Sequence, residues 1–164
     1  MKNENHTLKF FVYGTLKSGE GNHRVAGTPD KIEEAFVVGN LRVAGIPFVE
    51  IPENNRLNLG TTSVEKDSSL LKKAGKLKGT DHFFEMAEYS IVSGQIFTYT
   101  GTEEYLKGVT DRLDSLEGYN PNGKNRMGYS RVVTLTTDGT PVFIYNSLGY
   151  GQEPVGKPME IVTF

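Results

Sequence analysis

The chain has 164 residues, 37% of them hydrophobic and 23% charged, which is typical of a single soluble domain (1–164) with a sizeable core. The net charge of −2 excludes a general attraction to nucleic acid or anionic membranes, and the lack of cysteine excludes disulfides, thiolate metal sites and a cysteine nucleophile. The polar N-terminus has no signal-peptide core, and no run of about 18 apolar residues occurs, so we expect a cytoplasmic location without a membrane span.

The first half of the chain predicts β-structure around a glycine-rich loop. Residues 8–13 are aromatic and β-favouring, as in a strand, and lead directly into 14–22, where three glycines let the backbone turn tightly and present its amides. A second strand is expected at 35–43, followed by a turn or edge segment at 45–48, because its proline cannot donate a hydrogen bond to a neighbouring strand. We interpret 52–90 as an insertion, mostly irregular but with room for one small helix.

The second half is expected to carry one long helix after a strand. The strand at 89–99 contains Gly94, a candidate for a β-bulge. Thr102 suits the N-cap of a helix over 103–116, with acidic residues favourable in the first turn, and Gly118 is the expected stop. One apolar stripe at helical spacing supports this helix: Leu106, Val109, Leu113 and Leu116.

The C-terminal part predicts a β-hairpin. Strands at 129–136 and 141–145 flank an Asp-Gly turn at 138–139, and 161–164 is a candidate edge strand. Helices do not alternate regularly with strands, which disfavours a doubly wound parallel sheet. We therefore predict an α+β fold in which a mixed, mainly antiparallel sheet curls towards a small barrel and is covered by the helix.

Glu117 occupies a position in the predicted helix that is electrostatically unfavourable for a carboxylate. The C-terminal end of a helix carries partial negative charge and unpaired carbonyl groups, and both repel a carboxylate. An exposed glutamate tolerates this at little cost, whereas a buried one has a raised pKa and becomes a better proton acceptor. Asp114 lies one turn earlier and is expected to cap the following loop or to pair with an arginine. The candidate arginines are Arg112, Arg126 and Arg131.

Three short motifs stand in a recognisable order. They are the Tyr-Gly-Thr-Leu loop at 13–16, the Leu-Asp-Ser-Leu-Glu-Gly-Tyr helix end at 113–119 and the Tyr-Ser-Arg strand start at 129–131. In this order and spacing, the chain resembles the γ-glutamylcyclotransferase-like superfamily, including its AIG2-like and γ-glutamylamine cyclotransferase branches. The resemblance covers 8–48 and 91–145 and leaves the insertion unmatched.

The resemblance implies a small β-barrel with flanking helices and a cofactor-independent, amide-cleaving transferase or lyase. Such an enzyme converts a γ-glutamyl amine or amide into 5-oxoproline and a free amine. The α-amine attacks its own γ-carbonyl, and Glu117 moves the proton as general acid/base. The amides of 14–16 would bind the α-carboxylate or stabilise the oxyanion. The implied substrate-binding residues are Tyr13, Gly14, Thr15, Leu16, Asn22, Tyr119 and Tyr145.

Some of these residues also have a plain structural interpretation. Tyr119 suits packing slightly better than a pocket wall, and Tyr145 is a candidate hydrogen-bond partner of Glu117 or of the substrate. Tyr129 and Arg131 are interpreted as structural. The alternative function is a non-catalytic module that binds a small metabolite or a peptide end, which the insertion motivates. The histidines lack metal-ligand spacing, and we expect no metal, cofactor, nucleic acid or membrane partner.

Overall fold

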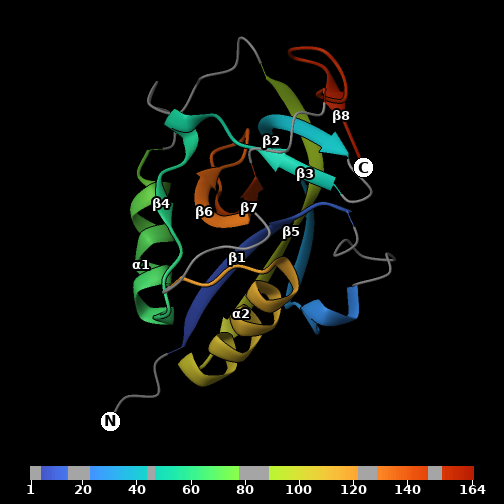
Figure 1. The fold of residues 1–164 in the computed structure, drawn as a ribbon. Helices are drawn as coiled ribbons and strands as arrows, with labels where there is room; N and C mark the ends of the chain where they lie inside the picture. Colours follow the sequence, from blue (N-terminus) through green and yellow to red (C-terminus); the bar gives the residue numbers. More distant parts are fainter. Residues whose placement is uncertain (1–4, 15–22, 44–46, 78–88, 122–128, 148–152) are drawn as a thin grey trace.

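The computed structural model describes residues 5–14, 23–43, 47–77, 89–121, 129–147 and 153–164 (Figure 1). In chain order the described elements are β1 (His6–Val12), η2 (His23–Ala26), β2 (Lys31–Val43), β3 (Pro47–Glu50), η3 (Glu53–Asn55), β4 (Asn58–Leu59), α1 (Val64–Gly75), β5 (Ser90–Gly101), α2 (Glu103–Glu117), β6 (Tyr129–Leu135), β7 (Pro141–Ser147) and β8 (Ile161–Val162). Among these residues, no helix combines the length and apolarity needed to cross a membrane.

The described strands form one eight-stranded sheet in the order β3-β2-β5-β1-β7-β6-β4, with β8 paired to β5. β1 and β7 pair in parallel, as do β5 and β8, and the other neighbours are antiparallel, so the predicted α+β class and mixed, mainly antiparallel sheet are confirmed. The sheet does not close into the predicted barrel, because β3 and β4 remain its two ends. These end strands have only four and two residues, and β3 begins with a proline, so neither offers a ladder long enough to join the ends.

The sheet has two apolar faces, because successive side chains of a strand point to opposite sides. Phe10 on β1 belongs to a core cluster that also contains buried side chains of α1 and α2. The next residue, Phe11, belongs to a second cluster that brings Val49 of β3 together with Val132 of β6, so the sheet curls around this second core. Burying each of these side chains stabilises the fold by about 1.5–3 kcal/mol.

The span 52–90 has more regular structure than predicted, because η3, β4 and α1 all lie within it. α1 begins after Ser63, whose side chain caps the helix by accepting a hydrogen bond from Lys66 N. Its buried side chains recur at helical spacing: Val64, Asp67, Ser68, Leu71 and Ala74. Two of these five are polar, so hydrophobic periodicity alone does not reveal the buried face. Residues 78–88 lie outside the described residues.

Local signals placed α2, the β6–β7 hairpin and two short edge strands correctly. The side chain of Thr102 caps α2, and Gly118, at φ 73°, ends it in the left-handed conformation. β6 and β7 form the predicted hairpin, and the short strands β3 and β8 occupy the predicted edge segments. The β2 strand begins at Lys31 rather than at residue 35.

The β-bulge considered at Gly94 is wrong. β5 pairs with β2 in an uninterrupted register in which Gly94 lies opposite Ala35. A Cβ atom on Gly94 would instead lie 2.5 Å from Val12 O and 2.6 Å from the Phe11 ring. Glycine is therefore needed here because the end of β1 crosses close to the β5 backbone.

Candidate active site

Glu117 is the last residue of α2, and its carboxyl group is partly buried. Desolvation by this burial raises its pKa to about 7. The last turn of α2 contains no basic residue that would offset the negative end of the helix dipole. Near neutral pH the carboxyl group therefore exists in both its protonated and its ionised form, as a proton-transfer group requires.

Two tyrosines, the half-buried Tyr13 and the buried Tyr145, lie within the electrostatic influence of Glu117. Burial, followed by the Glu117 charge, raises the pKa of Tyr13 well above its usual value. For Tyr145 the main causes of a raised pKa are burial and Asp114, with a smaller contribution from Glu117. The Tyr13 hydroxyl donates a hydrogen bond to the Tyr145 backbone oxygen at 2.5 Å. Because β1 and β7 are parallel neighbours, this bond holds Tyr13, the residue that follows β1, against the β7 backbone.

Asp114, one turn before Glu117, is fixed by two strong partners. The Tyr145 hydroxyl donates to Asp114 Oδ1 at 2.6 Å, so this hydroxyl bonds Asp114 and not Glu117. Arg131 Nε also donates to Asp114 Oδ1, at 2.9 Å, so Arg131 is an arginine partner of Asp114, whereas the candidate Arg126 lies outside the described residues. Burial raises the pKa of Asp114, and the positive charge of Arg131 opposes that rise. α2 thus presents one structural carboxylate and, one turn later, one that is suited to exchange a proton.

Arg131 is completely buried and connects several elements. Its Nη1 donates to Asp67 Oδ2 on α1 at 3.0 Å, and its Nη2 donates to the backbone oxygen of Thr61 at 2.8 Å. The guanidinium group lies 4.7 Å from the centroid of the Phe143 ring and 5.5 Å from that of Tyr119. Arg131 therefore ties α1, α2 and the β6–β7 hairpin together, in agreement with its predicted structural role.

Asp67 is the residue of this network that sequence reasoning missed. It is 1% exposed and lies three residues after Val64 and four before Leu71, on the buried face of α1. Its Oδ1 accepts hydrogen bonds from the Thr61 amide at 2.8 Å and hydroxyl at 2.9 Å, while Oδ2 pairs with Arg131. An acid at a core-facing helical position is the signal that could have revealed it, because a buried carboxylate requires a charged partner.

The remaining predicted site residues divide into two groups. The buried Tyr119 donates its hydroxyl hydrogen to Gly60 O at 2.8 Å, which favours packing, and its role in binding stays a prediction. Gly14 is buried at φ 74°, and a Cβ atom there would lie 2.5 Å from Pro47 Cγ. Glycine is thus required where the chain leaves β1. Thr15, Leu16 and Asn22 lie outside the described residues.

Replacing Gly14 by alanine is expected to lower the free energy of unfolding by about 1–3 kcal/mol, because the left-handed φ disfavours a side chain and the added atom meets Pro47. Urea unfolding measures this change. Gly27→Ala is the matched control: its φ of 70° is similar, but its Cβ would meet only the end of the Arg112 side chain, at 3.1 Å. Equal losses for the two variants would show that the Pro47 contact does not matter.

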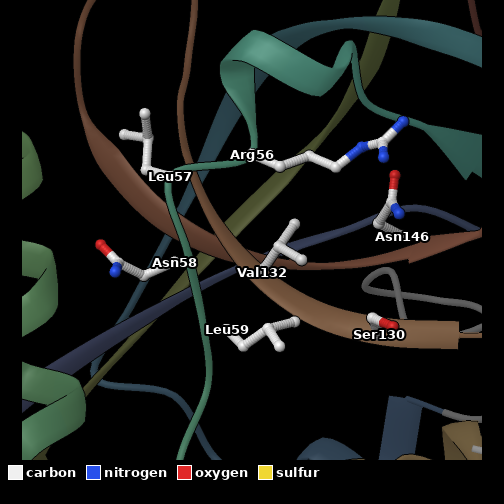
Figure 2. Close-up of a pocket in the computed structure, with 7 residues that line it drawn as sticks. All are labelled: Arg56, Leu57, Asn58, Leu59, Ser130, Val132 and Asn146. Carbon is white, nitrogen blue, oxygen red and sulfur yellow. The ribbon is translucent and has the colours of Figure 1, made fainter.

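Two cavities lie close to this network. The first has a volume of about 460 Å³ and opens on the face of β6 opposite to Arg131 (Figure 2). Its lining residues are Arg56, Leu57, Asn58, Leu59, Ser130, Val132 and Asn146. The second has a volume of about 40 Å³ and lies beside Asp67 and Asp114. Neither has Glu117 among its lining residues.

No protein-family model matches the sequence, and no curated protein does. The fold, in contrast, is shared with an AIG2-like protein, as the sequence motifs predicted. The crystal structure of an AIG2-like protein from Mus musculus shares it at 22% identity and a TM-score of 0.52, over 94% of this chain and 86% of that one. The structure of uncharacterized protein PH0828 from Pyrococcus horikoshii matches at 14% identity and a TM-score of 0.47, over 93% of this chain and 86% of that one. The structure of YkqA from Bacillus subtilis matches at 17% identity and a TM-score of 0.48, over 93% of this chain and 38% of that one.

Proposed function

We propose that the chain is a cofactor-independent cyclotransferase that converts a γ-glutamyl amine or amide into 5-oxoproline and a free amine, with Glu117 as general acid/base. The observation that carries this proposal is the partly buried Glu117 carboxyl group, with a pKa of about 7, beside Tyr13 at the start of the glycine-rich loop. The AIG2-like fold supports it, because the resemblance that implies the roles of these residues also implies this fold.

The proposed reaction uses the substrate as its own nucleophile. Bound substrate enters with a protonated α-amine, and the ionised Glu117 carboxylate removes one proton to free the nitrogen lone pair. The α-nitrogen then attacks the γ-carbonyl carbon, and the new carbon–nitrogen bond closes the five-membered ring. Glu117 returns the proton to the leaving nitrogen as the old amide bond breaks. The ring nitrogen then loses its second proton, which the released amine takes up to leave as an ammonium ion. Since both reacting groups belong to one molecule, holding the bent conformer supplies much of the acceleration.

A substrate panel tests the proposal directly. Purified protein is incubated with γ-glutamyl amines and γ-glutamyl amino acids, and 5-oxoproline is measured by mass spectrometry. We expect release of 5-oxoproline together with an equal amount of the free amine from at least one member. The Glu117→Gln variant is incubated with the same panel, and the 5-oxoproline that it releases is the background. Failure of the wild-type protein on every member would overturn the proposal.

The rate should depend on pH through Glu117. Because the ionised form accepts the proton and the pKa is raised to about 7, kcat/KM is expected to rise as pH increases towards about 7 and then to level off. Below the midpoint the fall should approach tenfold per pH unit. The matched control is Asp111→Asn, which removes an exposed carboxylate from the same helix and should leave the profile unchanged. A wild-type profile that is flat from about pH 5 to 8 would contradict this role.

One observation favours the alternative of a non-catalytic binding module. The cavity of about 460 Å³ is lined by seven residues that do not include Glu117, so a ligand could bind there without meeting the proposed base. A thermal-shift screen distinguishes the two functions. Stabilisation by a metabolite that the protein never converts, together with an inert γ-glutamyl panel, would establish the binding module instead.

A further inference from the structure

The cavity in Figure 2 lies where the curled sheet fails to close, and we call it the seam pocket. It is defined by Arg56, Leu57, Asn58, Leu59, Ser130, Val132 and Asn146. Residues 51–57 cross from the end of β3 to the start of β4, which pairs with β6, and so span the open seam. The pocket is therefore a product of the incomplete barrel, and its volume is in the range of small-molecule sites.

Two hydrogen bonds to one residue fix the polar side of the seam pocket. Arg56 Nε donates to Ile51 O at 2.7 Å, and Ile51 N donates to Asn146 Oδ1, also at 2.7 Å. These bonds engage Arg56 through Nε and Asn146 through its oxygen. Within the described part of the chain these two bonds do not use the Arg56 Nη groups or the Asn146 Nδ2 group, which can therefore donate to a ligand. Figure 2 shows the Arg56 guanidinium group and the Asn146 amide next to each other.

The sheet register supplies the remaining walls. Ser130 lies directly opposite Asn146 in the β6–β7 ladder, and Val132 lies two residues further along the same face. Figure 2 shows Leu59 directed towards these side chains, while Leu57 and Asn58 point to the other side of their segment. Arg56 is the one cation among the seven lining residues, and none of the seven is a carboxylate. The pocket thus combines a positive, donor-rich end with an apolar wall.

We propose that the seam pocket binds a small amphipathic anion. A carboxylate or phosphate head accepts hydrogen bonds from Arg56, Asn146 and Ser130, and a short branched aliphatic body lies on Leu59 and Val132. Leu59 is 60% exposed in the free protein, so covering it with the ligand adds apolar burial. The site is distinct from the Glu117 region, because Ser130 and Val132 point to the opposite face of β6 from Tyr129 and Arg131.

Calorimetric titration tests this proposal with isocaproate, isoamyl phosphate and the neutral isocaproamide. We expect one or both anions to bind saturably and the amide not to bind, and the stronger anion identifies the head group. Arg56→Gln should weaken binding at least tenfold, which corresponds to about 1.4 kcal/mol. Ser130→Asp should abolish it by placing a like charge in the pocket. This variant keeps the Arg56–Ile51 bond, so it remains informative if Arg56→Gln does not fold.

Two control variants test whether anion binding is specific to the seam pocket. Arg24→Gln removes one positive charge from an exposed position and should retain the affinity within about twofold. Glu117→Gln should bind the same anion unchanged, whether or not the proposed cyclotransferase activity exists. The proposal is overturned if no anion binds saturably or if the amide binds as well as the anions. It also fails if Arg24→Gln matches Arg56→Gln, or if Glu117→Gln loses binding.

Discussion

Replacing Glu117 by glutamine is expected to reduce 5-oxoproline release by roughly 10²–10⁴-fold, because the amide cannot accept the substrate proton. The loss should appear in kcat, since glutamine keeps nearly the same size and shape. Glu117→Asp keeps a carboxylate on a shorter side chain, and a partial activity in that variant would identify the carboxylate as the group that matters. A Gln variant with the full wild-type rate would contradict the proposed role.

The same substitution is expected to stabilise the protein at neutral and higher pH. The pKa of Glu117 is about 7 in the folded state against a usual value of 4.5, so between these values the folded chain binds more protons than the unfolded chain. The free energy of unfolding of the wild-type protein therefore falls as pH rises from about 4.5 to about 7. Glutamine does not titrate, and above about pH 7 the variant should be more stable by about 3 kcal/mol.

Urea unfolding at several pH values measures this difference. It should vanish below about pH 4.5, where the Glu117 carboxyl group is protonated in both states, and reach a plateau above about pH 7. Asp111→Asn provides the baseline for removing an exposed carboxylate from α2 and should change stability by less than about 0.5 kcal/mol. A Gln variant less stable than wild type at pH 8 would show that the ionised carboxylate has a favourable partner in the folded protein.

The second large effect is expected for Arg131→Met, which should lower the free energy of unfolding by about 3–5 kcal/mol. The substitution removes the positive charge between Asp67 and Asp114 and leaves two buried carboxylates without it. Urea unfolding at neutral pH provides the measurement. The matched control is Lys107→Met, which breaks an exposed pair to Asp111 and should cost no more than about 0.5 kcal/mol.

A combined variant separates the lost charge from the lost packing. Adding Asp67→Asn and Asp114→Asn to Arg131→Met removes the buried negative charges, so part of the stability should return. If the combined variant is less stable than Arg131→Met alone, packing and hydrogen bonds, and not charge, account for the loss. If Arg131→Met is as stable as the wild-type protein, the network does not hold α1 and α2 to the hairpin.

The candidate site was partly predictable from the chain. Glu117 was identifiable because it directly precedes Gly118, the glycine that ends the helix, where the helix dipole disfavours a carboxylate. This argument needs only adjacent residues of the sequence. Its raised pKa was not predictable, because it depends on how deeply the end of α2 is buried. The hydroxyl of Tyr145 was a candidate partner of Glu117 or of the substrate, yet its bond goes to Asp114, which lies 31 positions away and meets Tyr145 only in the folded chain.

By itself, the sequence determined the local elements of this protein: the capped helix α2, the β6–β7 hairpin, the short strands β3 and β8, and the motif order that points to the AIG2-like fold. These follow from caps, turns and side-chain periodicity, which act between residues a few positions apart. Only the tertiary structure decided the open sheet, the buried face of α1 and the bond between Asp67 and Arg131, which are 64 positions apart. Such pairings depend on which surfaces meet after folding, and neighbouring residues do not encode that.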